Sequence, residues 1–189
     1  MKTYPRIVCL AAAVACLSLG FVSTPAVRAE DAATSQPAKQ DAIDFRKMKA
    51  VMPETLVGIK REKIEGQKNK IGDQSFSTAN ADYGTGDGDN AKTAKIMVID
   101  YSSPDFAKSM AVWMATDIDQ ETDDSYTKTA DIQGRKALIT YNKANKTGSV
   151  QTLAGNRIMV QFETQNLTDE EFNKAFAELP LKALDELVK

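Results

Sequence analysis

The sequence predicts an α+β fold, with a mostly antiparallel sheet of about six to seven strands packed with two main helices. Alternation between apolar and polar residues, typical of half-buried strands, recurs through the second half of the chain. Turn signals such as Gly155-Asn156 separate these segments, as they do in hairpins. Two segments with helical spacing of apolar residues begin at good capping residues, Ser103 and Thr168.

In the first half of the chain we expect a short helix followed by three strands. The helix lies within residues 41–51 and stops before Pro53. Residues 56–67 start apolar and become alternating and charged, which predicts one strand that runs out to a sheet edge. The side chains of residues 75–83 alternate strictly between two faces, which predicts a half-buried strand. Residues 94–101 are the most continuously apolar, so we place them centrally with cover on both faces.

The helix that starts at Ser103 is predicted to run to about residue 119. Ser103 is a natural N-cap, and Pro104 follows where its missing N–H is harmless. An apolar stripe along this helix is expected to pack on the sheet, although it could instead line a pocket for a hydrophobic ligand. The stripe consists of Phe106, Met110, Trp113 and Met114.

Four strands and a broken helix complete the domain. The strands are predicted at residues 125–132, 135–142, 149–154 and 157–164, arranged mostly as an antiparallel meander. The helix begins with the capping box Thr168-Asp169-Glu170-Glu171, and Pro180 interrupts it before a last apolar turn or two.

Residues 1–29 have the composition of an export signal. Lys2 and Arg6 precede an apolar run at residues 7–22, and Ala29 offers a small residue at a cleavage site. The alternative is a signal retained as an N-terminal anchor. We expect residues 30–42 to be a disordered linker and residues 43–189 to form a single domain, located in the periplasm or secreted.

Composition excludes several classes of chemistry. The chain has no histidine, and both cysteines, Cys9 and Cys16, lie within the predicted signal. The domain therefore lacks Ser-His and Cys-His dyads and thiolate metal sites. The formal net charge is −2, and removing the signal leaves the chain more acidic, because Lys2, Arg6 and Arg28 go with it. We expect no nucleic-acid partner and no membrane span after cleavage.

Two acidic segments are weak candidates for a hard cation such as calcium, which takes several oxygen ligands. The first is the glycine-rich loop at residues 82–90, and the second is the run at residues 117–124. The candidate ligands are Asp82, Asp87, Asp89, Asp117, Asp119 and Glu121. Ordinary turn chemistry is the favoured explanation of the first segment, and a solvated loop between a helix and a strand is that of the second.

The order of elements behind an export signal resembles the PsbP-like α/β/α sandwich over roughly residues 50–189. The likeness is carried by Pro53-Glu54-Thr55-Leu56 with Gly58-Ile59-Lys60-Arg61, by the strand at residues 94–101, and by the helices at residues 103–119 and at the C-terminus. The resemblance implies a small binding or accessory protein that docks on a larger assembly without catalysis. It transfers no functional residue.

The sequence thus favours a non-enzymatic exported accessory domain that acts through contact with a protein partner in the envelope, with no cofactor. The alternative from another class is a periplasmic protein that binds calcium or a small ligand. A hydrolase that uses two carboxylates is a third interpretation, since such enzymes need no histidine.

Overall fold

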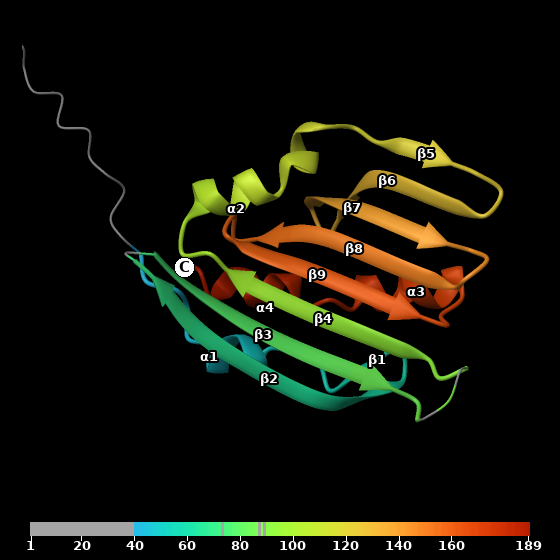
Figure 1. The fold of residues 1–189 in the computed structure, drawn as a ribbon, viewed down its shortest axis with the longest axis horizontal. Coiled ribbons are helices and arrows are strands. Elements are labelled where there is room, and N and C mark those ends of the chain that lie inside the picture. Colours follow the sequence, from blue (N-terminus) through green and yellow to red (C-terminus); the bar gives the residue numbers. More distant parts are fainter. Residues whose placement is uncertain (1–39, 73, 87, 89) are drawn as a thin grey trace, which may run out of the picture. The chain divides into compact units, whose positions relative to one another are not determined.

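The computed structural model describes residues 40–72, 74–86, 88 and 90–189, which belong to one compact unit (Figure 1). The predicted signal at residues 1–29 and the predicted linker up to residue 39 lie outside the described residues. The α+β class and the antiparallel pairing are confirmed. The sheet, however, has nine strands, in the order β1-β2-β3-β4-β9-β8-β7-β6-β5.

The elements have the following bounds. The strands are β1 Thr55–Leu56, β2 Ile59–Ile71, β3 Gln74–Gly84, β4 Thr93–Asp100, β5 Asp119–Glu121, β6 Ser125–Ile132, β7 Arg135–Asn142, β8 Thr147–Ala154 and β9 Ile158–Gln165. The helices are α1 Phe45–Ala50, α2 Pro104–Met110, the 3-10 helix η1 Val112–Ala115, α3 Asp169–Ala177 and α4 Leu181–Glu186.

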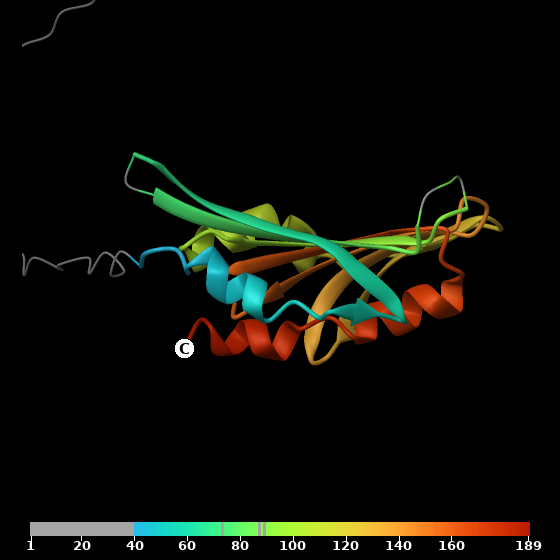
Figure 2. The same cartoon turned by 90° about the horizontal axis from the view of Figure 1, so that it is seen from below.

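The helices are divided unequally between the two faces of the sheet. Helices α1, α3 and α4 lie on one face, where Figure 2 shows them as a separate layer. Helices α2 and η1 pack on the opposite face, against side chains of β7, β8 and β9 and the end of β4. No helix of the described residues lies on the rest of that second face, and we call it the open face.

The core lies between the sheet and the layer of α1, α3 and α4, and Phe172 of α3 is at its centre. Its ring stacks on Tyr141, with centroids 5.3 Å apart, and on Phe162 at 6.2 Å. Gly148 of β8 lies under the same ring. A Cβ atom at this position would come within 2.5 Å of the Phe172 ring, so the packing there requires glycine.

The predicted hairpins and caps of the second half are confirmed. Gly155 and Asn156 have φ values of 53° and 59°, as a type I′ turn requires, and they join β8 to β9. The capping box at α3 is complete. The Thr168 hydroxyl accepts from the Glu171 N–H at 3.3 Å, and the Glu171 carboxylate accepts from the Thr168 N–H at 3.0 Å.

The prediction of one strand over residues 56–67 is wrong. Val57 and Gly58 form a tight turn with φ values of 49° and 77°, so β1 pairs back on the start of β2. Strand β2 then extends to Ile71. The sequence hid this turn because valine, a β-branched residue, is disfavoured at positive φ.

Full cover of residues 94–101 is also a wrong prediction. Ala94, Ile96 and Val98 of β4 are buried against the helix layer. Lys95 is exposed and Met97 is only half-buried, because both point to the open face. An apolar run thus belongs to a central strand here without being covered on both sides.

The predicted helix over residues 103–119 is shorter and turned differently. Ser103 caps it as expected, but α2 ends at Met110 and η1 follows. The side that packs on the sheet consists of Ala107, Ala111 and Trp113. Trp113 of the predicted stripe is thus buried and Met114 is partly buried beside it, as expected. Small alanines four residues apart face the sheet, which leaves Phe106 and Met110 of the stripe exposed.

Candidate functional site

The first predicted cation segment does not gather carboxylates in the described residues. Asp82 lies in β3 on the open face, with its carboxylate 3.8 Å from the Lys95 ammonium. Asp87 and Asp89 lie outside the described residues. Thr85 and Lys92 close the base of the loop, since the Thr85 N–H donates to the Lys92 carbonyl at 3.2 Å. A cation site in this loop stays a prediction.

Most of the second segment is a solvated loop, as the alternative to a cation site predicts, and three exposed residues at its middle form the short strand β5. Strand β5 begins at Asp119 and ends at Glu121, and it pairs with β6 at the sheet edge. Lys136 lies 2.6 Å from Asp117 and lowers the pKa of that carboxyl, while Lys143 lies 3.0 Å from Glu121. Across the described residues, no three Asp, Glu, His or Cys side chains converge as a metal cluster.

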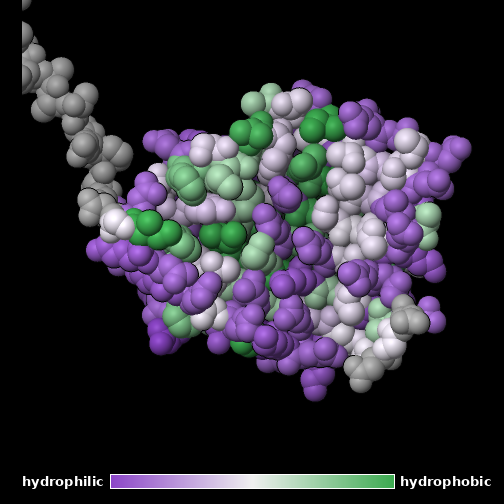
Figure 3. Space-filling model, viewed as in Figure 1, coloured by the Kyte–Doolittle hydropathy of each residue, from purple (hydrophilic) through white to green (hydrophobic). Residues whose placement is uncertain are grey.

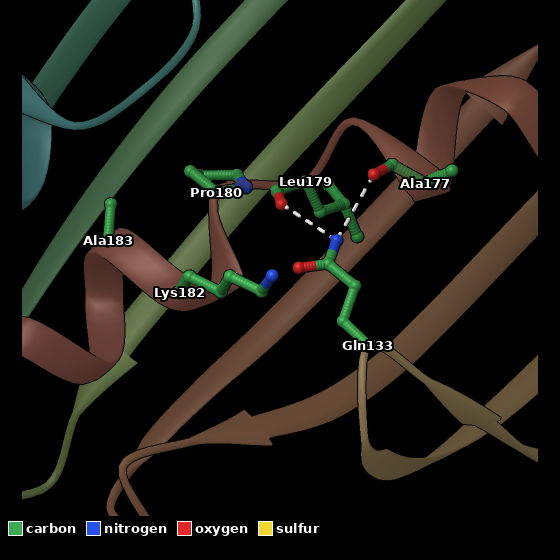
Figure 4. Close-up of a pocket in the computed structure, with 6 residues that line it drawn as sticks. All are labelled: Gln133, Ala177, Leu179, Pro180, Lys182 and Ala183. Atoms are coloured by element: carbon green, nitrogen blue, oxygen red, sulfur yellow. Dashed lines mark hydrogen bonds between the residues drawn. The ribbon is translucent and has the colours of Figure 1, made fainter.

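A hollow of about 630 Å³ lies at the junction of α3 and α4 (Figure 4). Gln133 reaches into it from the turn between β6 and β7. Its amide nitrogen donates to the carbonyls of Ala177 and Leu179, each at 3.1 Å. These bonds satisfy carbonyls at the end of α3. The Gln133 amide therefore links the turn to the α3–α4 junction, and its nitrogen already donates to groups of the protein itself.

The one fully buried ion pair that the structure describes, Asp100 with Arg157, is also structural. The two side chains are joined by two hydrogen bonds of 2.8 Å and 2.6 Å. Asp100 also accepts from the Ile43 N–H at 2.7 Å, and Arg157 donates to the Asp41 carbonyl at 3.1 Å. The pair is thus enclosed by the first described residues, which it fastens to the end of the sheet.

The open face is left uncovered by the helices that the structure describes, and Figure 3 looks directly onto it. A row of four charged side chains crosses it on adjacent strands. By register, Lys63 of β2 pairs with Asp82 of β3, Asp82 with Lys95 of β4, and Lys95 with Glu163 of β9. We call this set the charged row. Its members alternate in sign across the sheet.

Within and beside the row the charges are partly compensated. Glu65, the next open-face residue of β2, lies 2.8 Å from Lys63. The pair raises the pKa of Lys63 and lowers that of Glu65, mainly through this hydrogen bond. Both groups are therefore charged at neutral pH, and both remain accessible to solvent.

The surface is apolar at one end of the sheet, where the open face meets α2 and η1. Ile71, Phe106, Met110 and Val112 are large hydrophobic side chains exposed by 69, 40, 52 and 72 %. A cavity of about 300 Å³ lies between Ile71 and Phe106 and is lined also by Phe76 and Tyr101. We call these six residues the apolar end. Green surface gathers over α2 in Figure 3, at the same end of the sheet.

The apolar end is ordered by aromatic contact. The rings of Tyr101 and Phe106 meet edge to face, with centroids 4.9 Å apart. Burial raises the pKa of the Tyr101 hydroxyl. The side chains are thus held in place while their outer surfaces stay in water, as in preformed contact surfaces.

Asn80 carries a buried polar atom without a hydrogen-bond partner among the described residues, on the same face. It is the residue of β3 two positions before Asp82, and the atom is its Oδ1. A buried acceptor without a donor is costly. A donor brought from outside the described chain would relieve that cost.

Sequence reasoning misses both the charged row and the apolar end. The row joins residues from four strands, and only the register brings them together. The apolar end is assigned to the core on sequence alone, because Phe106 and Met110 have the spacing of a packed stripe. The signal that could have found it is the pair Ala107 and Ala111, which marks the true contact side of the helix.

Comparisons with known proteins add no relative. No family model, no curated protein and no solved structure matches this chain. The resemblance to PsbP-like domains accordingly stays a prediction. In the part of the chain that the structure describes, every helix is too short or too polar to cross a membrane.

Proposed function

We propose that this protein is a non-enzymatic accessory protein of the envelope, exported by its N-terminal signal, that acts through protein–protein contact at the open face. The location and the absence of catalysis are part of the proposal. The basic start and apolar run at residues 1–29 support export.

The observation that carries the proposal is the apolar end. Soluble proteins rarely leave several large apolar side chains exposed side by side, and such patches mark contact surfaces. Phe106 and Met110 belong to the residue types enriched in protein interfaces. Phe106 also lines a cavity, into which a partner's side chain could fit.

The charged row supports the same face. Polar and charged groups beside an apolar area are the usual anatomy of an interface, where they fix register and orientation more than affinity. The hollow at the α3–α4 junction and the Asp100–Arg157 pair offer no comparable surface, because their polar groups bond within the chain.

The test is a crosslinking pull-down of the tagged protein from its native envelope. The wild type is compared with Phe106→Asp combined with Met110→Asp, which places two charges on the apolar end. We expect crosslinked products from the wild type and a loss of at least about tenfold from the double variant, as for buried contact residues.

The matched control is Lys182→Asp, a charge change at an exposed position of α4 on the helix layer. It should leave the crosslinked products unchanged. Equal yields from the wild type and the double variant would overturn the proposal. Melting curves of all three proteins show whether each is folded.

A further inference from the structure

The alternating signs of the charged row have a consequence for symmetry. From β9 to β2 the row carries Glu163, Lys95, Asp82 and Lys63, which is minus, plus, minus, plus on four adjacent strands. When a row of four charges of alternating sign is read in the reverse direction, every position carries the opposite sign. A surface of this kind can meet a second copy of itself with opposite charges in contact.

A two-fold axis parallel to the strands, between β3 and β4, performs that reversal. It lays the open faces of two copies against each other, with β4 over β3 of the second copy and β9 over its β2. Lys95 then faces Asp82, and Glu163 faces Lys63, each contact occurring twice by symmetry.

A two-fold axis that runs across the strands does not bring opposite charges together. A two-fold axis across the strands sets each strand against its own copy, so Lys95 meets Lys95 and Glu163 meets Glu163. Like charges opposed in this way repel. The row therefore selects the strand-parallel axis.

The position of α2 and η1 agrees with the same axis. They lie on the same side of the sheet as the open face, over β7, β8 and β9, while among the described residues no helix lies over β2 and β3 on that side. A strand-parallel axis keeps the end of the sheet and exchanges its sides. It brings α2 of each copy toward the bare side of the other, where Ile71 and Phe76 belong to the apolar end.

We propose that the partner of the open face is a second copy of this chain, in a two-fold dimer with its axis parallel to the strands between β3 and β4. This inference rests on the proposed function, because it names the partner of the same face. It covers the exposed apolar side chains of α2.

The test uses two charge reversals that are complementary only between copies. In homodimers of the Lys95→Glu variant, the introduced carboxylate would face Asp82 of the second copy. In homodimers of the Asp82→Lys variant, the introduced ammonium would face Lys95. In a mixed dimer every one of these contacts joins opposite charges. The full chain is expressed with its own N-terminal segment, weighed by mass spectrometry and studied by analytical ultracentrifugation.

We expect the wild type to be a dimer at about 100 µM, where an interface of micromolar Kd is occupied. Each reversal alone should raise the dimer dissociation constant at least about tenfold, because like charges meet twice. An equimolar mixture, with one variant labelled by a fluorophore, should recover dimers. Lys182→Glu, with the same change of charge on the helix layer, should dimerise as the wild type does.

Two results would overturn the inference. One is a monomeric wild type at this concentration, and the other is a mixture of the two variants that stays monomeric although both are folded by their melting curves. The proposed function can hold when the dimer does not form. A monomeric chain whose open face still crosslinks to a different envelope protein would refute the second copy and retain the contact surface.

Discussion

At the residue scale, Val57 is the clearest point of backbone strain. Its φ of 49° is unfavourable for a β-branched residue, and the turn is retained because β1 pairs with β2 and the Val57 N–H donates to Glu178 at 2.8 Å. This hydrogen bond is donated by the backbone N–H, so it does not depend on the side chain at position 57. A residue that accepts positive φ should therefore fit this turn better.

We expect Val57→Asn to raise the free energy of unfolding by about 0.5–1 kcal/mol, since Asn-Gly is a favoured type I′ sequence. Urea denaturation measures it. The matched control is Val51→Asn, at a partly buried valine with φ −93°, where only packing is lost and stability should fall. Equal losses in the two variants would refute the strain at Val57.

Tyr83 gives a prediction for pH. Burial raises its pKa to about 12 from an ordinary value of 10.0, and its hydroxyl donates to the Pro53 carbonyl at 2.8 Å. The folded pKa lies above the unfolded one. Stability from this group is therefore complete below pH 10 and is lost as pH rises toward about 12.

The variant Tyr83→Phe isolates this effect. Near pH 9 the wild type should be more stable by about 1 kcal/mol, the net value of a hydrogen bond. Its advantage should shrink as pH rises through about 10 to 11, because ionisation then favours the unfolded wild type only. Urea midpoints across this range test the prediction, and a constant difference would contradict it.

At the scale of elements, the Asp100–Arg157 pair holds the start of the domain. It joins the end of β4 to the residue before β9, and it bonds Asp41 and Ile43 ahead of α1. Ser75 and Lys68 add bonds from β3 and β2 to Ala42. Residues at the end of the predicted linker are thus fixed to the sheet.

We expect Asp100→Asn to cost about 3–5 kcal/mol, because it leaves the Arg157 guanidinium buried without its counter-charge. The control Asp117→Asn breaks an ion pair with Lys136 in which the carboxylate is 97 % exposed, and should change the free energy of unfolding far less. Chemical denaturation of both variants compares them. Similar losses would mean that the buried pair is not what stabilises this end.

The elements also show how far sequence reasoning reaches. Local signals place the β8–β9 hairpin and the capping box at Thr168 correctly, because each depends on residues close in the chain. The Val57-Gly58 turn and the contact side of α2 are missed. In both cases tertiary packing overrides the local preference of the residues.

At the scale of the whole domain, the open face could not be predicted from the sequence. The alternation of apolar and polar residues shows that one face of each strand is polar. The same pattern is expected for a face exposed to solvent and for a face that binds a partner. The charged row depends on the register of four strands, including the contact of β4 with β9, which are distant in the chain. Only the assembled sheet reveals it.

The central claim is that the open face is where this protein meets another polypeptide. The most direct measurement replaces Met97, half-buried on that face, with a photo-crosslinking amino acid and irradiates cells that carry the full chain. The same replacement at exposed Lys182 of α4 is the control. We predict a crosslinked product from position 97 and none from position 182. Crosslinks from position 182 alone, or equal products from both, would contradict the claim.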